Sequence, residues 1–208
     1  MIKQLLKRSP FVTGYLQKKR LENWVRDRPP TEVSHDVKQL GILYHAIANR
    51  LDVLVETGTY LGDMVWAQKD YFRKIYSIEL SEDLFARAVK RFARISNVEL
   101  YQGDSSQRIN DVLSKLSGPA LFWLDGHYSG GITAKGDKVC PIYGELDHIF
   151  RSSFEHVILV DDARLFAGED DYPTLAELAG FVSTNSKYEM RVENDMIILS
   201  LPAKKFDR

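Results

Sequence analysis

The chain alternates short apolar runs with segments of helical spacing, and this alternation limits the folds open to it. Five runs have the length and composition of buried strands: 51–57, 74–80, 98–104, 119–126 and 156–162. Helical patterns precede, separate and follow them, at 35–50, 64–72, 82–95, 106–116, 142–152 and 172–183. Strands joined by helices form right-handed βαβ units, in which helices cover both faces of a parallel sheet. The sequence therefore predicts an α/β fold.

The end of the chain departs from this alternation. Residues 188–201, YEMRVENDMIILSL, have the pattern of two strands joined by a tight turn around Asn194 and Asp195. Strands joined so closely run antiparallel, so the last strand should oppose its partner. The fold class predicted is a doubly wound, mostly parallel seven-stranded sheet with a C-terminal antiparallel hairpin. Three large aromatic side chains within these patterns are expected in the core: Trp66, Phe72 and Trp123.

The start of the chain differs in character from the rest. The first 28 residues contain eight basic side chains and two acidic ones, an excess of six positive charges, and Pro29 and Pro30 then interrupt any helix. We predict a basic helical extension over 1–34 and one domain over 35–208, since 208 residues are too few for two ordinary domains. The extension either touches a membrane surface, nucleic acid or an acidic substrate, or packs on the domain or on a second subunit of a homo-oligomer. Charge runs are usually solvated, which favours the second alternative.

The composition limits which kind of binding partner and which cellular compartment are expected. A net charge of -1 argues against a nucleic-acid binder that works through bulk electrostatics. Cys140 is the only cysteine, so an internal disulfide is excluded, which fits a reducing compartment. No stretch approaches the roughly 18 apolar residues of a membrane span, and the start lacks an apolar signal region. We expect a cytoplasmic protein without a transmembrane segment, acting on a small molecule.

Acidic residues follow every predicted parallel strand. They are Glu56, Glu79, Asp104, Asp125, Asp161 and Asp162. In an open α/β sheet, ligands bind beyond the carboxyl ends of the strands, so these residues are the first candidates for a site. One acidic residue at a strand end often only starts a turn or caps a helix. Acidic residues at five consecutive strand ends favour a binding role.

The turn after the first strand, VETGTYLGD (55–63), limits the class of ligand that can bind there. A dinucleotide would suit Glu79 as an acceptor from ribose hydroxyls, but its fingerprint G-x-G-x-x-G needs a second glycine where Tyr60 stands. Glu56 would also bring a negative charge close to a phosphate that binds a helix N-terminus. A ligand with a cationic group suits this turn better.

Five motifs, in their order and spacing, resemble those of the class I S-adenosylmethionine-dependent methyltransferases: VETGTYLGD, SIELSEDL, YQGDSSQ, FWLDGHYS and HVILVDDAR. The resemblance extends from about Val37 to Leu201, and the closing hairpin is similar to the reversed seventh strand of this Rossmann-like family. It implies a cofactor site built from Glu56, Gly58, Thr59, Gly62, Glu79, Asp104, Ser105 and Asp125.

Within that site the resemblance implies separate roles. Glu56 and the glycine turn would hold the methionine portion of S-adenosylmethionine, and Glu79 would accept from the ribose hydroxyls. Asp104 with Ser105 would meet the adenine amino group. The alternative for Glu79 and Asp104 is a role in turns and helix caps, although Ser81 and Ser105 could form those caps instead.

A narrower resemblance concerns LDGHY and VDD. These motifs are similar to the metal-dependent O-methyltransferases of sugar and antibiotic tailoring (macrocin O-methyltransferase-like), which implies a Mg²⁺ site at Asp125, Asp161 and Asp162. His127 departs from that pattern, because an acidic residue is expected there. Either His127 is the base and no metal is bound, or the surroundings of the metal differ; Asp125 and His127 are the catalytic candidates. A structural alternative is that Asp161 caps the next segment and Asp162 pairs with Arg164.

The function predicted is transfer of a methyl group from S-adenosylmethionine to a hydroxyl of a small acceptor, a sugar or secondary metabolite. The glycine-rich connection 126–141 is long enough to act as a lid over that acceptor. Three alternatives stay open: a nucleic-acid methyltransferase that uses the basic extension, a non-catalytic module that binds S-adenosylmethionine, and a dehydrogenase. The first lacks the N/D-P-P-Y type signature after the fourth strand that methylation of base amino groups would favour.

Overall fold

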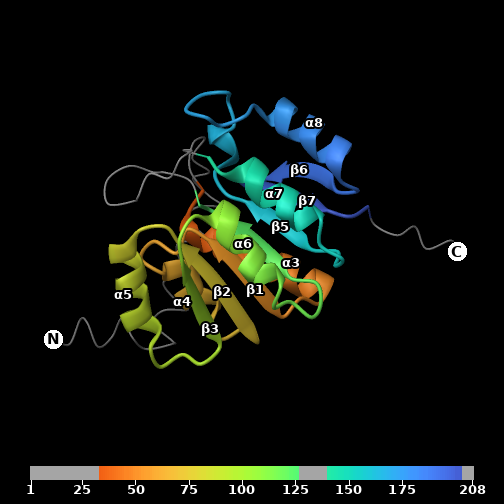
Figure 1. The fold of residues 1–208 in the computed structure, drawn as a ribbon. Helices are drawn as coiled ribbons and strands as arrows, with labels where there is room; N and C mark the ends of the chain where they lie inside the picture. The colour runs from red at the N-terminus through yellow and green to blue at the C-terminus, as the bar shows by residue number, and fades with distance from the viewer. Residues whose placement is uncertain (1–32, 127–139, 203–208) are drawn as a thin grey trace, which may run out of the picture.

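A computed structural model describes residues 33–126 and 140–202 (Figure 1). Its centre is one seven-stranded sheet with the strand order β3-β2-β1-β4-β5-β7-β6. The strands are β1 (Val53–Thr57), β2 (Lys74–Glu79), β3 (Val98–Gln102), β4 (Leu121–Leu124), β5 (Val157–Val160), β6 (Glu189–Glu193) and β7 (Met196–Ser200). All pairs among β1 to β5 are parallel, while β7 is antiparallel to both β5 and β6. The predicted fold class is confirmed.

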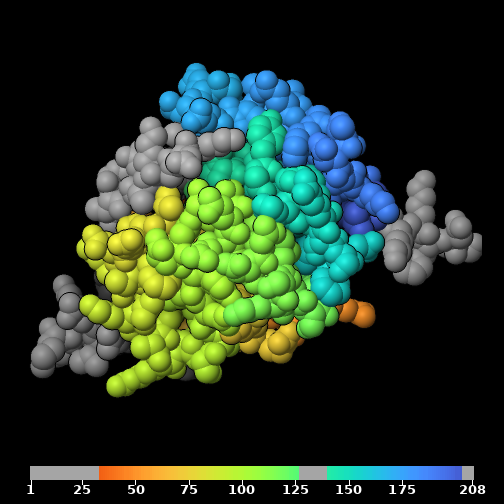
Figure 2. Space-filling model, in the orientation of Figure 1, coloured from red at the N-terminus to blue at the C-terminus, as the bar shows by residue number. Residues whose placement is uncertain are grey.

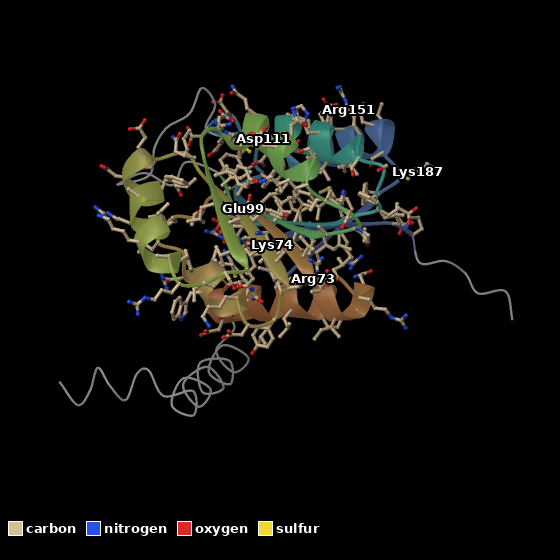
Figure 3. The ribbon with its side chains drawn as sticks, turned by 60° about the horizontal axis from the view of Figure 1, so that its bottom comes forward. Arg73, Lys74, Glu99, Asp111, Arg151 and Lys187 are labelled. Carbon is tan, nitrogen blue, oxygen red and sulfur yellow. The ribbon has the colours of Figure 1, made fainter. Side chains whose placement is uncertain are left out.

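The helices lie in two layers on either side of this sheet. They are α3 (His35–Asn49), α4 (Asp63–Gln68), α5 (Glu82–Phe92), α6 (Ser105–Leu113), α7 (Ile142–Phe150) and α8 (Leu175–Asn185), with a short 3₁₀ helix η1 (Ala163–Leu165). Figure 3 shows α3 on one side of the sheet and the green and teal helices α6 and α7 on the other. In Figure 2 the atoms of α6 and α7 cover the near side of the sheet as one layer.

Each layer has its own apolar core, because successive strand residues point to opposite faces. Val53 and Val55 of β1 belong to the cluster that includes residues of α6, α7 and α8. Leu54, between them, belongs to the cluster formed with α3, α4 and α5. Trp123 of β4 is fully buried in the second cluster. Both faces of the parallel strands are therefore covered, and the ligand-accessible edge is left at the strand ends.

The C-terminal hairpin brings its turn to the end of β5. Asn194 and Asp195 both have left-handed φ angles, 50° and 60°, as a two-residue hairpin turn requires. The Asp195 carbonyl accepts from the Ala163 backbone N–H at 2.9 Å, and its carboxylate accepts from the Arg164 N–H at 2.9 Å. The hairpin thus holds the segment that follows β5.

Helices α4 to α7 end earlier than their patterns predict, α4 by the most, and one aromatic prediction is wrong. α4 ends at Gln68 because the side-chain amide of Asn97 donates to the carbonyls of Lys69 and Phe72, both at 2.8 Å, and ends the helical pairing there. Phe72 and Trp123 are buried as expected, but Trp66 is 46% exposed. Its ring lies under cationic groups of Lys69 and Arg91, which lower the cost of leaving it at the surface.

At the amino ends of β2 and β3, charged side chains form ion pairs at the surface. Arg73 Nε lies 2.7 Å from Asp52 Oδ2, and Lys74 Nζ lies 2.7 Å from Glu99 Oε2 (Figure 3). Lys115 and Lys74 hold the pKa of Glu99 at about 2. Within the described ranges, no helix combines the length and apolar character that crossing a membrane requires.

Candidate active site

The strand order creates a switch point at the carboxyl ends of β1 and β4. From β1 the chain proceeds through β2 and β3 on one side, and it then returns to β4 and β5 on the other. Crossovers therefore diverge between β1 and β4, which is where open α/β sheets bind ligands. The six acidic residues predicted at strand ends lie along this edge in two regions, four at or near the ends of β1 to β4 and two at the end of β5.

The turn after β1 passes very close to the end of β4. The Asp125 backbone N–H donates to the Thr57 carbonyl at 3.1 Å. Gly58 has φ +82°, and a Cβ there would lie 2.2 Å from the Asp125 carbonyl oxygen. A larger residue at 58 would separate the two strand ends, so this glycine is required by the switch point itself.

The rest of the turn is equally constrained. Tyr60 has a left-handed φ of 49°, and Gly62, the N-cap of α4, has φ 78°. The Gly62 N–H donates to the Thr59 carbonyl at 2.7 Å, which closes the turn. A Cβ at Gly62 would lie 2.7 Å from a ring carbon of Phe92 on α5. The turn is packed against the neighbouring helix and is held in one conformation.

Glu79, at the end of β2, fastens this turn with its carboxylate. Oε2 accepts from the Tyr60 backbone N–H at 2.7 Å, and Oε1 accepts from the Ser81 N–H at 2.8 Å. Glu79 is buried, and burial raises the pKa of its carboxyl although the N–H donors oppose this. A carboxylate can accept about four hydrogen bonds, so lone pairs stay available for a ligand.

Glu56 lies beneath the same turn in a chain of hydroxyl groups. The Ser77 hydroxyl donates to Glu56 Oε2, and Ser77 Oγ lies 2.6 Å from Thr59 Oγ1. Glu56 is 1% exposed. Burial, opposed by the Ser77 hydrogen bond and aided by the nearby Glu79 carboxylate, raises the pKa of Glu56 to about 8. In the ligand-free protein at neutral pH this carboxyl is therefore largely protonated.

Asp104 and Ser105 follow β3, which lies next to β2 in the sheet. Asp104 is the N-cap of α6: its Oδ1 accepts from the Ser106 N–H at 2.8 Å and from the Ser106 hydroxyl at 2.6 Å. Ser81 caps α5 through the Leu84 N–H. The capping alternative is thus confirmed for Asp104, and Ser105 does not replace it. Ser105 itself is buried at the start of α6.

The second region is the end of β5, where charges are paired. Lys38 Nζ, from the first turn of α3, lies 2.6 Å from Asp161 Oδ1 and 2.6 Å from Asp162 Oδ1. Arg164 NH1 lies 2.7 Å from Asp162 Oδ1 and also contacts Asp195. Burial raises the pKa of Asp161, Asp162 adds to this and Lys38 opposes it. Burial lowers the pKa of Lys38, but the two carboxylates outweigh burial and raise it overall.

A small recess opens beside this cluster, between the ends of β4 and β5 and the start of α7. Its polar lining comes from Glu145, Asp161 and Tyr172, with Cys140 and Gly126 beside them. Burial raises the pKa of the Cys140 thiol to about 12, so it is no nucleophile at neutral pH. The recess therefore offers hydrogen-bonding groups and no reactive thiolate.

Solved structures with this arrangement include methyltransferases. The methyltransferase PaMTH1 of Podospora anserina, bound to S-adenosylhomocysteine, superposes with a TM-score of 0.58 at 16% identity, covering 87% of this chain and 86% of that one. The O-methyltransferase of Bacillus cereus, also with S-adenosylhomocysteine, gives a TM-score of 0.56 at 14% identity, covering 90% of each chain. The O-methyltransferase TomG of Streptomyces achromogenes, in complex with S-adenosylmethionine, gives 0.55 at 16%, covering 89% and 88%.

The chain has the fold of the class I S-adenosylmethionine-dependent methyltransferases. No family model matches the chain, and no curated protein matches it either.

On this methyltransferase fold, the predicted cofactor residues fall into one contiguous edge. Glu56, Thr59 and Glu79 are linked by Ser77 and by the glycine turn. Asp125 adjoins Gly58 through its carbonyl. Asp104 and Ser105 lie farther along, past the Gly103 N–H that donates to the Glu79 carbonyl at 2.9 Å. His127, most of the predicted lid and residues 1–32 lie outside the described residues.

The predicted Mg²⁺ site is not supported. Among the described residues, no group of three or more His, Cys, Asp or Glu side chains could hold a metal ion. The physical reason is that Lys38 already lies between the Asp161 and Asp162 carboxylates. The structural alternative is confirmed for Asp162, which pairs with Arg164.

Two residues important to the site were missed from the sequence. Lys38 is 124 positions from Asp162, and only the fold brings them together. A signal was present: Lys38 shares the buried face of α3 with Val37 and Ile42, where a charge requires a buried partner. Ser77 likewise stands as a polar residue within the buried strand β2, where it bridges Glu56 and Thr59.

Proposed function

We propose that the protein transfers a methyl group from S-adenosylmethionine to a hydroxyl of a small acceptor, a sugar or secondary metabolite. The observation that carries the proposal is the bond from the Tyr60 N–H to Glu79 Oε2, 2.7 Å long. In dinucleotide sites, the N–H groups of this turn face the pyrophosphate. Here one of them is taken by a carboxylate, which disfavours a phosphate and favours a ligand with hydroxyl and cationic groups.

The residues of the first region fit S-adenosylmethionine. This cofactor supplies a methyl group bound to a positively charged sulfonium sulfur. Glu79 would accept from the ribose hydroxyls with the lone pairs that its backbone partners leave. Glu56 and the Gly58 turn would hold the methionine end, because an ammonium group nearby favours the ionised form of Glu56. Asp104 and Ser105 would bind the adenine end.

Asp125 is the candidate to accept the proton of the acceptor hydroxyl, with His127 as its helper or as the alternative base. It follows β4 directly and is fixed at the switch point by the bond between its N–H and the Thr57 carbonyl. The recess next to it presents Glu145, Asp161 and Tyr172. Carboxylates and a phenol hydroxyl pair with hydroxyl groups of a substrate, which supports a small hydroxylated acceptor. Positioning of that hydroxyl would supply much of the rate.

The experiment is methyl transfer from S-adenosylmethionine carrying a labelled methyl group to a panel of sugars and phenols. We expect label in at least one hydroxylated acceptor. Asp125→Asn should lower that turnover by about 100-fold or more, since a positioned base contributes on that order, while S-adenosylhomocysteine affinity stays within about twofold. Asp111→Asn, on the exposed side of α6, is the matched control and should change neither quantity. Full turnover by Asp125→Asn would remove it from the mechanism.

A further inference from the structure

The acidic pair at the end of β5, Asp161 and Asp162, has an unexpected partner. That partner is a lysine from a helix distant in the sequence. We propose that Lys38 is a built-in cation that occupies the position a divalent metal ion would take between Asp161 and Asp162, so that this site works without metal. The inference refers to the acceptor side of the proposed methyltransferase. Its test measures cation binding. The inference about Lys38 can therefore fail while the proposed methyl transfer is confirmed, and the methyl transfer can fail while the inference about Lys38 holds.

The first support is the geometry of the ammonium group. Lys38 Nζ is equidistant, at 2.6 Å, from one oxygen of each carboxylate. The side chains are 9%, 5% and 13% exposed for Lys38, Asp161 and Asp162, so solvent does little to screen the contact. Two carboxylates that converge on one point are the ligand type that hard divalent cations prefer. Here that point is filled by a group of the protein.

The second support is the backbone that makes the carboxylates converge. Asp162 has a left-handed φ of 55°, a conformation that is costly for a residue with a side chain. Its N–H donates to Asp161 Oδ1 at 2.7 Å. The turn therefore directs both carboxylates toward Lys38, and the position of Lys38 is set in turn by α3, which packs on the sheet through Ile42 and Ala46.

The third support is charge. Around this point stand three carboxylates, of Asp161, Asp162 and Asp195, and two cations, Lys38 and Arg164. A Mg²⁺ ion bonded to the same oxygens at about 2.1 Å would lie within a few ångströms of the ammonium group. Repulsion between like charges opposes this, and Lys38 cannot withdraw without leaving its buried position on α3.

It follows that removal of the Lys38 charge should open the position to a metal. Lys38→Gln keeps a side chain that can donate to both carboxylates but removes the charge. We expect Lys38→Gln to bind Mn²⁺ at least about tenfold more tightly than the unaltered protein, measured by loss of the free Mn²⁺ signal in electron paramagnetic resonance. The double variant Lys38→Gln/Asp161→Asn should lose this gain. Lys90→Gln, an exposed lysine of α5, is the matched control and should bind as the unaltered protein does.

If Lys38→Gln is unstable, thermal unfolding with added Mn²⁺ replaces the binding measurement, because a cation that binds only the folded form raises its melting temperature. The expected result is a larger Mn²⁺-dependent rise for Lys38→Gln than for Lys90→Gln. Two results would overturn the proposal. One is Mn²⁺ binding by the unaltered protein that Asp161→Asn abolishes, and the other is a Lys38→Gln variant with no gain in binding or Mn²⁺-dependent stability.

Discussion

The two acidic regions of the sheet edge satisfy their carboxyl groups in opposite ways. At the ends of β1 and β2, Glu56 and Glu79 accept from a hydroxyl and from backbone N–H groups, which are neutral donors. At the end of β5, Asp161 and Asp162 are bound by Lys38 and Arg164. Buried carboxyls without a cation attract a positively charged ligand, whereas paired ones are already neutralised. On the proposed function we therefore expect the cofactor in the first region, while the second region is an internal network of paired charges.

The largest expected effect is on stability in the β5 region. Lys38→Met should lower the free energy of unfolding by about 3–5 kcal/mol, because it leaves two buried carboxylates without their shared cation. Urea denaturation at neutral pH measures this. Lys38→Met/Asp161→Asn should recover part of the loss, since one of the two charges is then gone. A loss below about 1 kcal/mol would mean that the pair behaves as an exposed one.

A second effect should appear in the β1 region as a dependence of stability on pH. The pKa of Glu56 is raised from 4.5 to about 8, so the folded state binds a proton that the unfolded state releases between these values. Stability should therefore fall as pH rises through this window, by up to about 1.4 kcal/mol for each pH unit from Glu56.

Glu56→Gln isolates this contribution, because glutamine has similar shape and no charge. The difference in unfolding free energy between the two proteins, measured by denaturant titration from pH 5 to 8, should shift in favour of Glu56→Gln as the pH rises. A difference independent of pH would show that Glu56 has an ordinary pKa. The proposed electrostatic difference between the two regions would then lose its main support.

A smaller effect is expected on cofactor affinity. Glu79→Gln keeps an oxygen that can accept from the Tyr60 N–H but offers a weaker acceptor to ribose hydroxyls. We expect about a tenfold loss of affinity for S-adenosylhomocysteine, the size of one charge-assisted hydrogen bond. Glu82→Gln, in the exposed first turn of α5, should leave the affinity unchanged. Equal affinities for both variants would remove the ribose role from Glu79.

The two regions also differ in how much of their structure the sequence predicts. Glu56, Gly58 and Glu79 could be placed together because each lies at the carboxyl end of a strand, and parallel strands end at one edge. Their bonding could not be predicted, since the contact from Glu79 to Tyr60 depends on the left-handed turn at Tyr60. At the end of β5 the local motif predicted a metal, but the deciding residue, Lys38, comes from a helix that precedes β1.

The fold shows the same distinction between local and long-range causes. The hairpin turn at Asn194 and Asp195 is a local preference, and the sequence alone predicted it correctly. The end of α4 depends on Asn97, and the exposure of Trp66 depends in part on Arg91 of α5. Neither interaction leaves a trace in the helical spacing of 64–72, so the boundary and the core assignment of Trp66 were wrong.

We propose above all that the ends of β1 and β2 bind S-adenosylmethionine and not a dinucleotide. Isothermal titration calorimetry of the unaltered protein with S-adenosylhomocysteine, and separately with NAD, tests it most directly. We expect saturable heat at one site for S-adenosylhomocysteine and none for NAD. Binding of NAD with no binding of S-adenosylhomocysteine would contradict it.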